Sequence, residues 1–275
     1  RVLFRSLSAT PQAITYPSHS SGEFLNIWAF AALRTDGSVV TWGNSLYGGN
    51  SSAVATQLDG TIDVTQIFSN EYAFAALRTD GSVVTWGYDS YGGDSGTVAA
   101  QLDGTIDVAR IFSTQSAFAA LRADGSVVTW GSGFGGNSTT IAATLDGAVD
   151  VTEVFSNVGA FAALRADGSV MTWGDVGYGG KSSSIATQLD GTIDVTQVFS
   201  TKSAFAALRA DGSVVTWGSS WDGGNSSAVQ SALNGTIDVM QVFSSVGAFA
   251  ALRADGSVVT WGHSGYGADS SAMQP

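Results

Sequence analysis

The sequence predicts an all-β protein built from six consecutive repeats of about 44 residues. Three observations support this fold class: a recurring Trp-Gly pair, an Asp-Gly turn between two apolar runs in every repeat, and an unusual composition. The chain has 275 residues, of which 35 are glycine, 44% are hydrophobic and only 12% are charged. Such glycine-rich, charge-poor chains with many aromatic residues are typical of short strands joined by tight turns.

The Trp-Gly pair marks the repeat, because its copies lie 43 or 44 residues apart. Nearly the same text surrounds each copy, as in residues 204–218. A string this specific, repeated six times, identifies a duplicated structural unit. The six tryptophans are Trp42, Trp86, Trp130, Trp173, Trp217 and Trp261.

Each repeat is predicted to contain a β-hairpin followed by a glycine- and serine-rich stretch and a further strand. Residues 204–209 form the first strand, and residues 213–217, rich in β-branched and aromatic residues, form the return strand. The Asp-Gly pair between them predicts a type I′ turn, which needs a positive φ at both central residues. Residues 61–68 exemplify the further strand.

Repeats of this length without helical periodicity predict a single closed β-propeller of six blades. A phenylalanine of the further strand supports six copies, but the Leu-Asp/Asn-Gly segment before it occurs only five times. Residues 1–22 are therefore expected to form an arm that closes the ring of blades in residues 23–275, with residues 12–16 as its strand. A seventh, degenerate blade built from this arm is the alternative. The six phenylalanines are Phe24, Phe68, Phe112, Phe155, Phe199 and Phe243.

Charge and composition exclude several classes of function. The net charge of −12 disfavours binding to nucleic acid and to anionic membrane surfaces. Cysteine is absent, no apolar stretch is long enough for membrane insertion, and no signal peptide is visible. The sequence shows no catalytic motif, so we expect a protein that is not an enzyme, without catalytic residues, metal or cofactor. The acidic, lysine-poor composition favours an extracellular or cell-surface location.

Some polar residues recur in every repeat and are expected to serve the scaffold. The aspartates of the Asp-Gly pair fit the geometry of the turn. The arginine two positions before each aspartate is expected to brace a neighbouring blade, and the Trp-Gly tryptophans are expected to pack. The aspartates are Asp36, Asp80, Asp124, Asp167, Asp211 and Asp255, and the arginines are Arg34, Arg78, Arg122, Arg165, Arg209 and Arg253.

Two segments vary between repeats. The first is the three-residue loop before each Ala-Phe-Ala-Ala-Leu strand, and equivalent loops of a propeller converge on one face. Large side chains there suit a protein interface, although drift in an unconstrained loop is the alternative. The predicted partner-binding residues are Trp28, Glu71, Tyr72, Gln115 and Lys202.

The second varied segment follows Trp-Gly and carries an aromatic residue in every repeat. Aromatic faces beside Asn, Asp and Ser suit sugar rings, so these residues are possible carbohydrate-binding sites, one per blade; filling of gaps between blades is the alternative. These residues are Tyr47, Tyr91, Phe134, Tyr178, Trp221 and Tyr266.

The run Ala-Leu-Arg-x-Asp-Gly-Ser-Val-x-Thr-Trp-Gly, followed by Tyr-Gly-Gly, resembles the repeat of the regulator-of-chromosome-condensation family. In repeat style it is most similar to the bacterial β-lactamase inhibitory propellers. The resemblance covers about residues 23–272 and implies a β-propeller, usually with seven blades. In the inhibitory propellers the binding loops fall where the first varied loop lies here. Nucleotide exchange on Ran and chromatin binding, which need specialised loops and basic surfaces, fit this acidic chain poorly.

The sequence therefore predicts a non-catalytic protein-interaction module of a secreted or surface protein, binding an unidentified protein through the varied loops. A lectin-like propeller with repeated weak carbohydrate sites is the first alternative. A purely structural repeat scaffold, natural or engineered by consensus, is the second.

Overall fold

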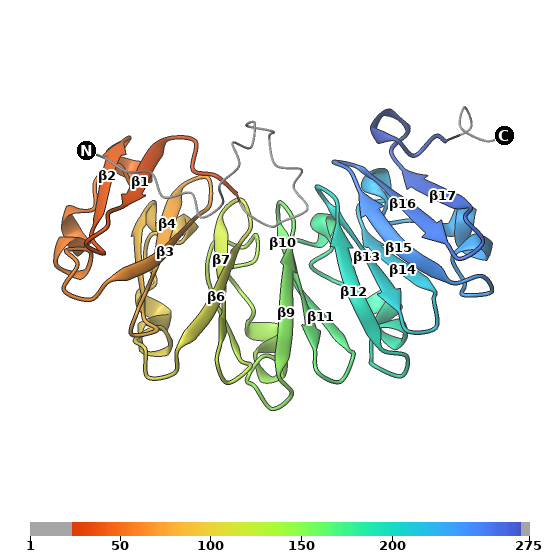
Figure 1. The fold of residues 1–275 in the computed structure, drawn as a ribbon, viewed down its shortest axis with the longest axis horizontal. Helices are drawn as coiled ribbons and strands as arrows, with labels where there is room; N and C mark the ends of the chain where they lie inside the picture. Colours follow the sequence, from red (N-terminus) through yellow and green to blue (C-terminus); the bar gives the residue numbers. More distant parts are fainter. Residues whose placement is uncertain (1–23, 271–275) are drawn as a thin grey trace. The chain divides into compact units, whose positions relative to one another are not determined.

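A computed structural model of the chain describes residues 24–270 (Figure 1). These residues form an all-β fold of repeated small sheets, as the repeat predicts. They divide into two compact units, residues 24–137 and residues 138–270. The expected closing arm in residues 1–22, and the seventh blade proposed as its alternative, lie outside the described residues.

The first unit contains one two-stranded and two three-stranded antiparallel sheets, in the orders β1-β2, β3-β4-β5 and β6-β7-β8. Short 3-10 helices follow the last strand of a sheet. The strands are β1 (Ala29–Leu33), β2 (Val39–Gly43), β3 (Val64–Ser69), β4 (Ala73–Arg78), β5 (Val83–Gly87), β6 (Val108–Ser113), β7 (Ala117–Arg122) and β8 (Val127–Gly131). The helices are η2 (Ser45–Tyr47), η3 (Ser52–Gln57), η4 (Asp89–Tyr91) and η5 (Gly96–Gln101).

The second unit contains three three-stranded sheets of the same type. Their strands are β9 (Val151–Ser156), β10 (Ala160–Arg165), β11 (Val170–Gly174), β12 (Val195–Ser200), β13 (Ala204–Arg209), β14 (Val214–Gly218), β15 (Val239–Ser244), β16 (Ala248–Arg253) and β17 (Val258–Gly262). The helices are η6 (Thr139–Thr144), η7 (Val176–Tyr178), η8 (Ser183–Gln188), η9 (Ser220–Asp222), η10 (Ser227–Ala232) and η11 (Ser264–Tyr266).

The predicted hairpin is confirmed, but the predicted turn type is wrong. In the hairpin of β13 and β14, the Gly212 N–H donates to the Arg209 carbonyl and the Arg209 N–H donates to the Ser213 carbonyl. Gly212 has a φ of +73°, whereas no other residue type within 24–270 has a positive φ. A three-residue loop that ends on a left-handed glycine is a type I turn with a G1 bulge, not a type I′ turn.

The central strand of each sheet packs on both of its faces. In β4, Ala73, Ala75 and Leu77 contact the following sheet, whereas Phe74 and Ala76 contact the preceding one. The small alanines receive the large Phe-Trp pair of the neighbouring sheet, so the two faces interlock at high density. The same division recurs between the successive sheets of the second unit.

The Trp-Gly tryptophans carry out the packing role that the sequence predicts for them. Trp86 lies opposite Phe74 on the neighbouring strand, with ring centroids 5.3 Å apart. Its indole N–H donates to the Gly48 carbonyl of the preceding repeat, at 3.1 Å. The same bond joins Trp130 to Gly92 within this unit. Trp86 and Trp130 thus each join two successive repeats by packing and by a buried hydrogen bond.

The segment after Trp-Gly differs from the prediction in two ways. The glycine- and serine-rich stretch forms short 3-10 helices, which the sequence analysis did not predict. The further strand begins at Val64 rather than at residue 61. The Leu58 carbonyl, between the two, accepts the Val39 N–H at 2.9 Å and extends the sheet by one bond at its outer edge.

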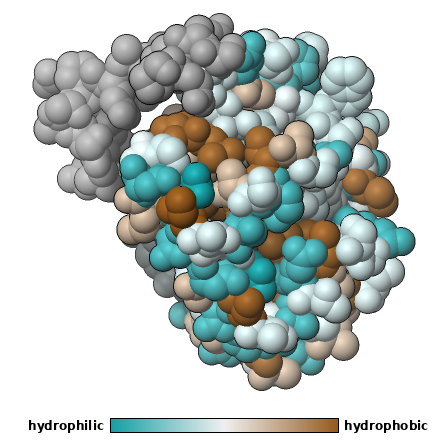
Figure 2. Space-filling model, turned by 90° about the vertical axis from the view of Figure 1, so that its right-hand side faces the viewer, coloured by the Kyte–Doolittle hydropathy of each residue, from teal (hydrophilic) through white to brown (hydrophobic). Residues whose placement is uncertain are grey.

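The terminal sheets expose faces that are buried elsewhere in the fold. In the two-stranded sheet, Phe30 is 63% exposed and Trp42 is 46% exposed, although their counterparts Phe74 and Trp86 are buried. In the last sheet, Val258 is 47% exposed. Figure 2 shows this side of the second unit, with apolar surface interrupted by polar side chains. Closure of these sheets into a ring remains a prediction.

Candidate functional site

The recurring aspartates serve the turn, as the sequence predicts. Asp36 accepts the backbone N–H of Ser38 at 3.0 Å and its hydroxyl at 2.6 Å. The hydroxyl bond, followed by the backbone bond, holds the pKa of the Asp36 carboxyl below its usual value. A carboxylate that already accepts two bonds inside its own loop is committed to the turn.

The expectation that the recurring arginines brace a neighbouring sheet is wrong for the pairs that the structure describes. Arg78 lies 3.3 Å from the carboxylate of Asp80, in the same hairpin, and donates to the Ser82 hydroxyl at 2.7 Å. The arginines of four later hairpins face the aspartate of their own turn at 3.6 to 4.0 Å. The aspartate of the turn lies only two residues after the arginine, so the arginine forms its ion pair within its own hairpin.

The two varied segments of each repeat are joined by a side-chain clamp. The first residue of the loop before the central strand is Asn, Thr or Ser, and its side chain donates to a carbonyl in the short turn after Trp-Gly. The acceptors are Tyr47, Tyr91, Phe134, Tyr178, Asp222 and Tyr266. The bonds are 2.6 to 2.9 Å long. Asn70, Thr114 and Asn157 are fully buried in this role. These loop residues, grouped by the sequence analysis with the varied surface, are therefore structural, and the two segments of a repeat lie side by side.

In the first unit this clamp brings together residues that the sequence analysis assigned to separate sites. Trp28 lies 5.3 Å from Tyr47, and Tyr72 lies 5.7 Å from Tyr47 and 4.7 Å from Tyr91, measured between ring centroids. Tyr88, which the sequence analysis did not single out, lies 5.8 Å from Tyr47 and 5.0 Å from Tyr91. We call these five residues the aromatic surface.

The predicted residues Glu71 and Gln115 lie beside each other, on the equivalent loops before β4 and β7. The Gln115 amide donates to the Glu71 carboxylate at 2.9 Å, and the Glu71 N–H donates to the Gln115 carbonyl at 3.2 Å. Burial, with the neighbouring Glu71 carboxylate, raises the pKa of the Tyr72 hydroxyl. Tyr72 therefore stays neutral at physiological pH and keeps its O–H as a hydrogen-bond donor.

In the second unit the predicted residues gather around a hollow with a volume of about 400 Å³. Tyr178, Lys202 and Tyr266 line it, with Ser203 and Asp222 between them. Trp221 lies outside it and is 76% exposed. It lines a second hollow of about 370 Å³ together with His263.

The carbohydrate residues predicted for every repeat are not equivalent in the structure. Tyr47 and Tyr91 contact other rings of the aromatic surface, Tyr178 and Tyr266 line a hollow, and Phe134 is 39% exposed. Repeated identical sites would require similar surroundings. The surroundings differ because the neighbouring loop residues differ from repeat to repeat.

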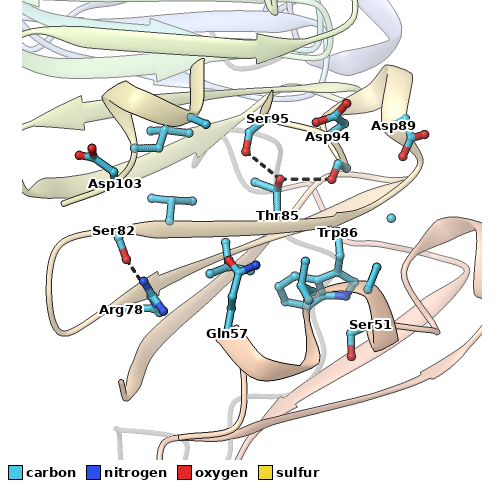
Figure 3. A pocket seen from close by; sticks show the side chains of 18 of the residues that line it. Ser51, Gln57, Arg78, Ser82, Thr85, Trp86, Asp89, Asp94, Ser95 and Asp103 are labelled. Atoms are coloured by element: carbon cyan, nitrogen blue, oxygen red, sulfur yellow. Dashed lines mark hydrogen bonds between the residues drawn. The ribbon is translucent and has the colours of Figure 1, made fainter. Parts of the chain in front are cut away.

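A larger hollow of about 590 Å³ lies beside β5 and is lined by scaffold residues (Figure 3). Thr85 bonds the Gly93 carbonyl at 3.2 Å and the Ser95 hydroxyl at 3.0 Å, and Arg78 donates to Ser82. The pair of Thr85 and Ser95 recurs as Thr216 and Ser226 in the second unit. Side chains that pair with each other and recur between repeats indicate packing rather than a binding site.

The part of the chain that the structure describes contains no group of three or more His, Cys, Asp or Glu side chains that could hold a metal ion. Within the same residues, no helix has the length and apolar character needed to cross a membrane.

Comparison with known proteins finds no matching family model and no matching curated protein. Solved structures do match. The ectodomain of the Physcomitrella patens receptor kinase CR4 matches with a TM-score of 0.48 and 16% identity, over 89% of this chain and 63% of that chain. Human WBSCR16 matches with a TM-score of 0.49 and 19% identity, over 85% and 73%.

Prp20p from Saccharomyces cerevisiae, a protein studied for its binding to Gsp1p and histones, matches with a TM-score of 0.48 and 15% identity, over 87% of this chain and 70% of that chain. A second match is yeast RCC1 (Prp20) bound to Kap60. The solved structures similar to this chain thus include a regulator-of-chromosome-condensation protein. The likeness to the β-lactamase inhibitory propellers remains a prediction.

Proposed function

We propose that this chain is a non-catalytic protein-interaction module and that the aromatic surface of its first unit is the binding site. The observation that carries this proposal is the contact of five Trp and Tyr rings from both varied segments. Tyrosine and tryptophan are the residues most enriched at the energetic centres of protein interfaces.

The exposure of these loops supports a protein partner. Trp28 is 47% exposed, and Ile27, which precedes it in the sequence, is 67% exposed. Leu46, which precedes Tyr47, is 55% exposed. Contiguous exposed apolar residues with a polar rim, supplied here by Glu71 and Gln115, are typical of interaction sites.

Rigidity supports the same proposal. The Asn26 and Asn70 clamps fix the turns that carry Tyr47 and Tyr91, and each ring packs against at least one other. A surface that is ordered before binding loses less conformational entropy when the partner arrives. The secreted or surface location and the closure of six blades into a ring belong to this proposal as predictions from the sequence.

The test compares two exposed tryptophans. Proteins captured on the immobilised chain are identified by mass spectrometry, and their affinities are measured for the unchanged chain, Trp28→Ala and the matched control Trp221→Ala. We expect Trp28→Ala to weaken binding about 30-fold, which corresponds to about 2 kcal/mol at an interface centre. Trp221→Ala is expected to bind like the unchanged chain.

Captured proteins that bind Trp28→Ala and Tyr72→Ala as tightly as the unchanged chain contradict the proposal. An equal loss in the Trp221→Ala control contradicts it as well, because the site would then not be confined to the aromatic surface.

A further inference from the structure

The hollow of about 400 Å³ in the second unit arises from one departure from the repeat. The residue whose carbonyl accepts the clamp bond is Tyr or Phe in five repeats, as in Tyr178 and Tyr266, but it is Asp222 in the fifth. The aromatic side chain moves one position back, to Trp221, and points to the surface, where it is 76% exposed. A small acidic side chain is left between the tyrosines of the preceding and following repeats.

The neighbouring backbone accommodates this change. A Cβ at Gly247 would lie 2.8 Å from the Asp222 carboxylate and 2.8 Å from the Tyr266 ring. Only a glycine therefore lets these two groups approach the same point of the following loop.

The walls of the hollow combine unlike polar groups with aromatic rings. The Asp222 carboxylate accepts the Ser203 hydroxyl, which leaves its remaining lone pairs open to the hollow. The Lys202 ammonium has no carboxylate within 4.0 Å among residues 24–270. An acceptor, a donor, and the two tyrosines thus face the same space.

We propose that this hollow binds a saccharide, with one pyranose ring between Tyr178 and Tyr266. A sugar hydroxyl is both donor and acceptor, so neighbouring hydroxyls can satisfy Asp222 and Lys202 together. The apolar C–H face of the ring packs on an aromatic side chain. The volume lies in the range of small-molecule sites, which is about 300–1,000 Å³.

The adjoining surface extends the site beyond one ring. Tyr266 lies 5.0 Å from the His263 ring, which lies 6.5 Å from Trp221, measured between centroids. His263 and Trp221 line the second hollow, of about 370 Å³. A ligand that leaves the first hollow over Tyr266 therefore meets a second aromatic platform, so the geometry fits a disaccharide or a longer chain.

This proposal differs from a lectin with one equivalent site per blade, because it depends on Asp222, which occurs at this position in only one repeat. It is independent of the protein-binding function proposed for the first unit, since no residue is shared with the aromatic surface.

The test uses the full chain and saturation-transfer NMR with methyl glycosides of D-glucose, D-galactose, D-mannose and N-acetyl-D-glucosamine, together with a glycan array for longer chains. We expect at least one saccharide to bind, and Asp222→Asn, which preserves the size of the side chain, to weaken it about tenfold. Tyr266→Ala is expected to weaken it to a similar extent. The matched control Phe134→Ala, at the equivalent position of the third repeat and outside the aromatic surface, should change the affinity by less than twofold.

Three results overturn the proposal. The first is that no saccharide binds, and the second is that a saccharide binds the unchanged chain and both hollow variants equally well. The third is a loss in Phe134→Ala equal to that in Tyr266→Ala, because the sites of different repeats would then be equivalent. If Asp222→Asn lowers the thermal unfolding temperature, Lys202→Met, on an exposed side chain, replaces it with the same expected loss.

Discussion

Replacement of Gly92 by alanine should destabilise the first unit strongly, because two independent costs act at this position. Gly92 has a φ of +99°, a conformation that costs other residues about 1–3 kcal/mol. The added Cβ would also lie 2.6 Å from Cδ2 of Phe118. Phe118 is fully buried against alanines of the adjacent sheet, so its ring cannot move aside without disturbing that packing. Overpacking of this kind costs about 1–3 kcal/mol.

We therefore expect Gly92→Ala to lower the free energy of unfolding by about 2–6 kcal/mol, measured by urea unfolding followed by tryptophan fluorescence. Gly133→Ala is the matched control, since no atom lies within 4 Å of its Cβ position and its φ is not positive. Its stability should stay the same or rise by about 0.4–1 kcal/mol. If the two variants unfold at the same urea concentration, the assigned contact between Gly92 and Phe118 is refuted.

Two further predictions concern the hairpin turns. Gly212→Val should lower the free energy of unfolding, measured by thermal or urea unfolding, by at least about 3 kcal/mol. A β-branched residue resists the φ of +73°, and its Cβ would lie 2.7 Å from the Asp238 Cα. An unchanged unfolding curve would disprove the turn assignment. Hydrogen bonds from Ser169 and Ser257 to Asp167 and Asp255 lower the pKa values of these carboxyls below 3.8 in the folded chain. The stability that these two carboxylates contribute is complete above their pKa in the unfolded chain, and it is lost as the pH falls through their pKa values in the folded chain. The melting temperature should therefore be constant above about pH 5 and fall below about pH 4. A constant melting temperature down to about pH 3 would contradict this prediction.

The repeat allowed the sheets, the hairpins and the packing of the tryptophans to be predicted, because each depends on residues that recur at fixed spacing. The turn type was missed because Asp-Gly occurs in both kinds of hairpin. The turn type is decided by where the strand ends. Because β13 ends at Arg209, Ala210 belongs to the loop and the loop has three residues instead of two. The pairing of the arginines was missed for a related reason, since a spacing of two residues across a bulge brings both side chains to one side of the turn.

The candidate sites could be predicted only as lists of residues, because variation between repeats does not distinguish a buried side chain from an exposed one. Asn70 and Tyr72 belong to the same varied loop, yet Asn70 is fully buried and Tyr72 is partly exposed. The amide or hydroxyl at the first position is restricted by a bond that spans 20 or 21 residues of sequence. A signal for this clamp was present, since only Asn, Thr and Ser occur there, and each can donate to a carbonyl.

That clamp also explains how one repeat supports different surfaces. It holds the two varied segments together with the same bond in every repeat, so changes at the other loop positions alter the surface without altering the sheet. In the first unit large residues at these positions produce contiguous rings. In the fifth repeat Thr201 keeps the bond while Asp222 replaces the ring, and a polar hollow results. The uniform scaffold and the unequal surfaces therefore have the same cause. The clamp side chain bonds to the backbone carbonyl of the turn residue, so the side chain of that turn residue can vary between repeats without loss of the bond.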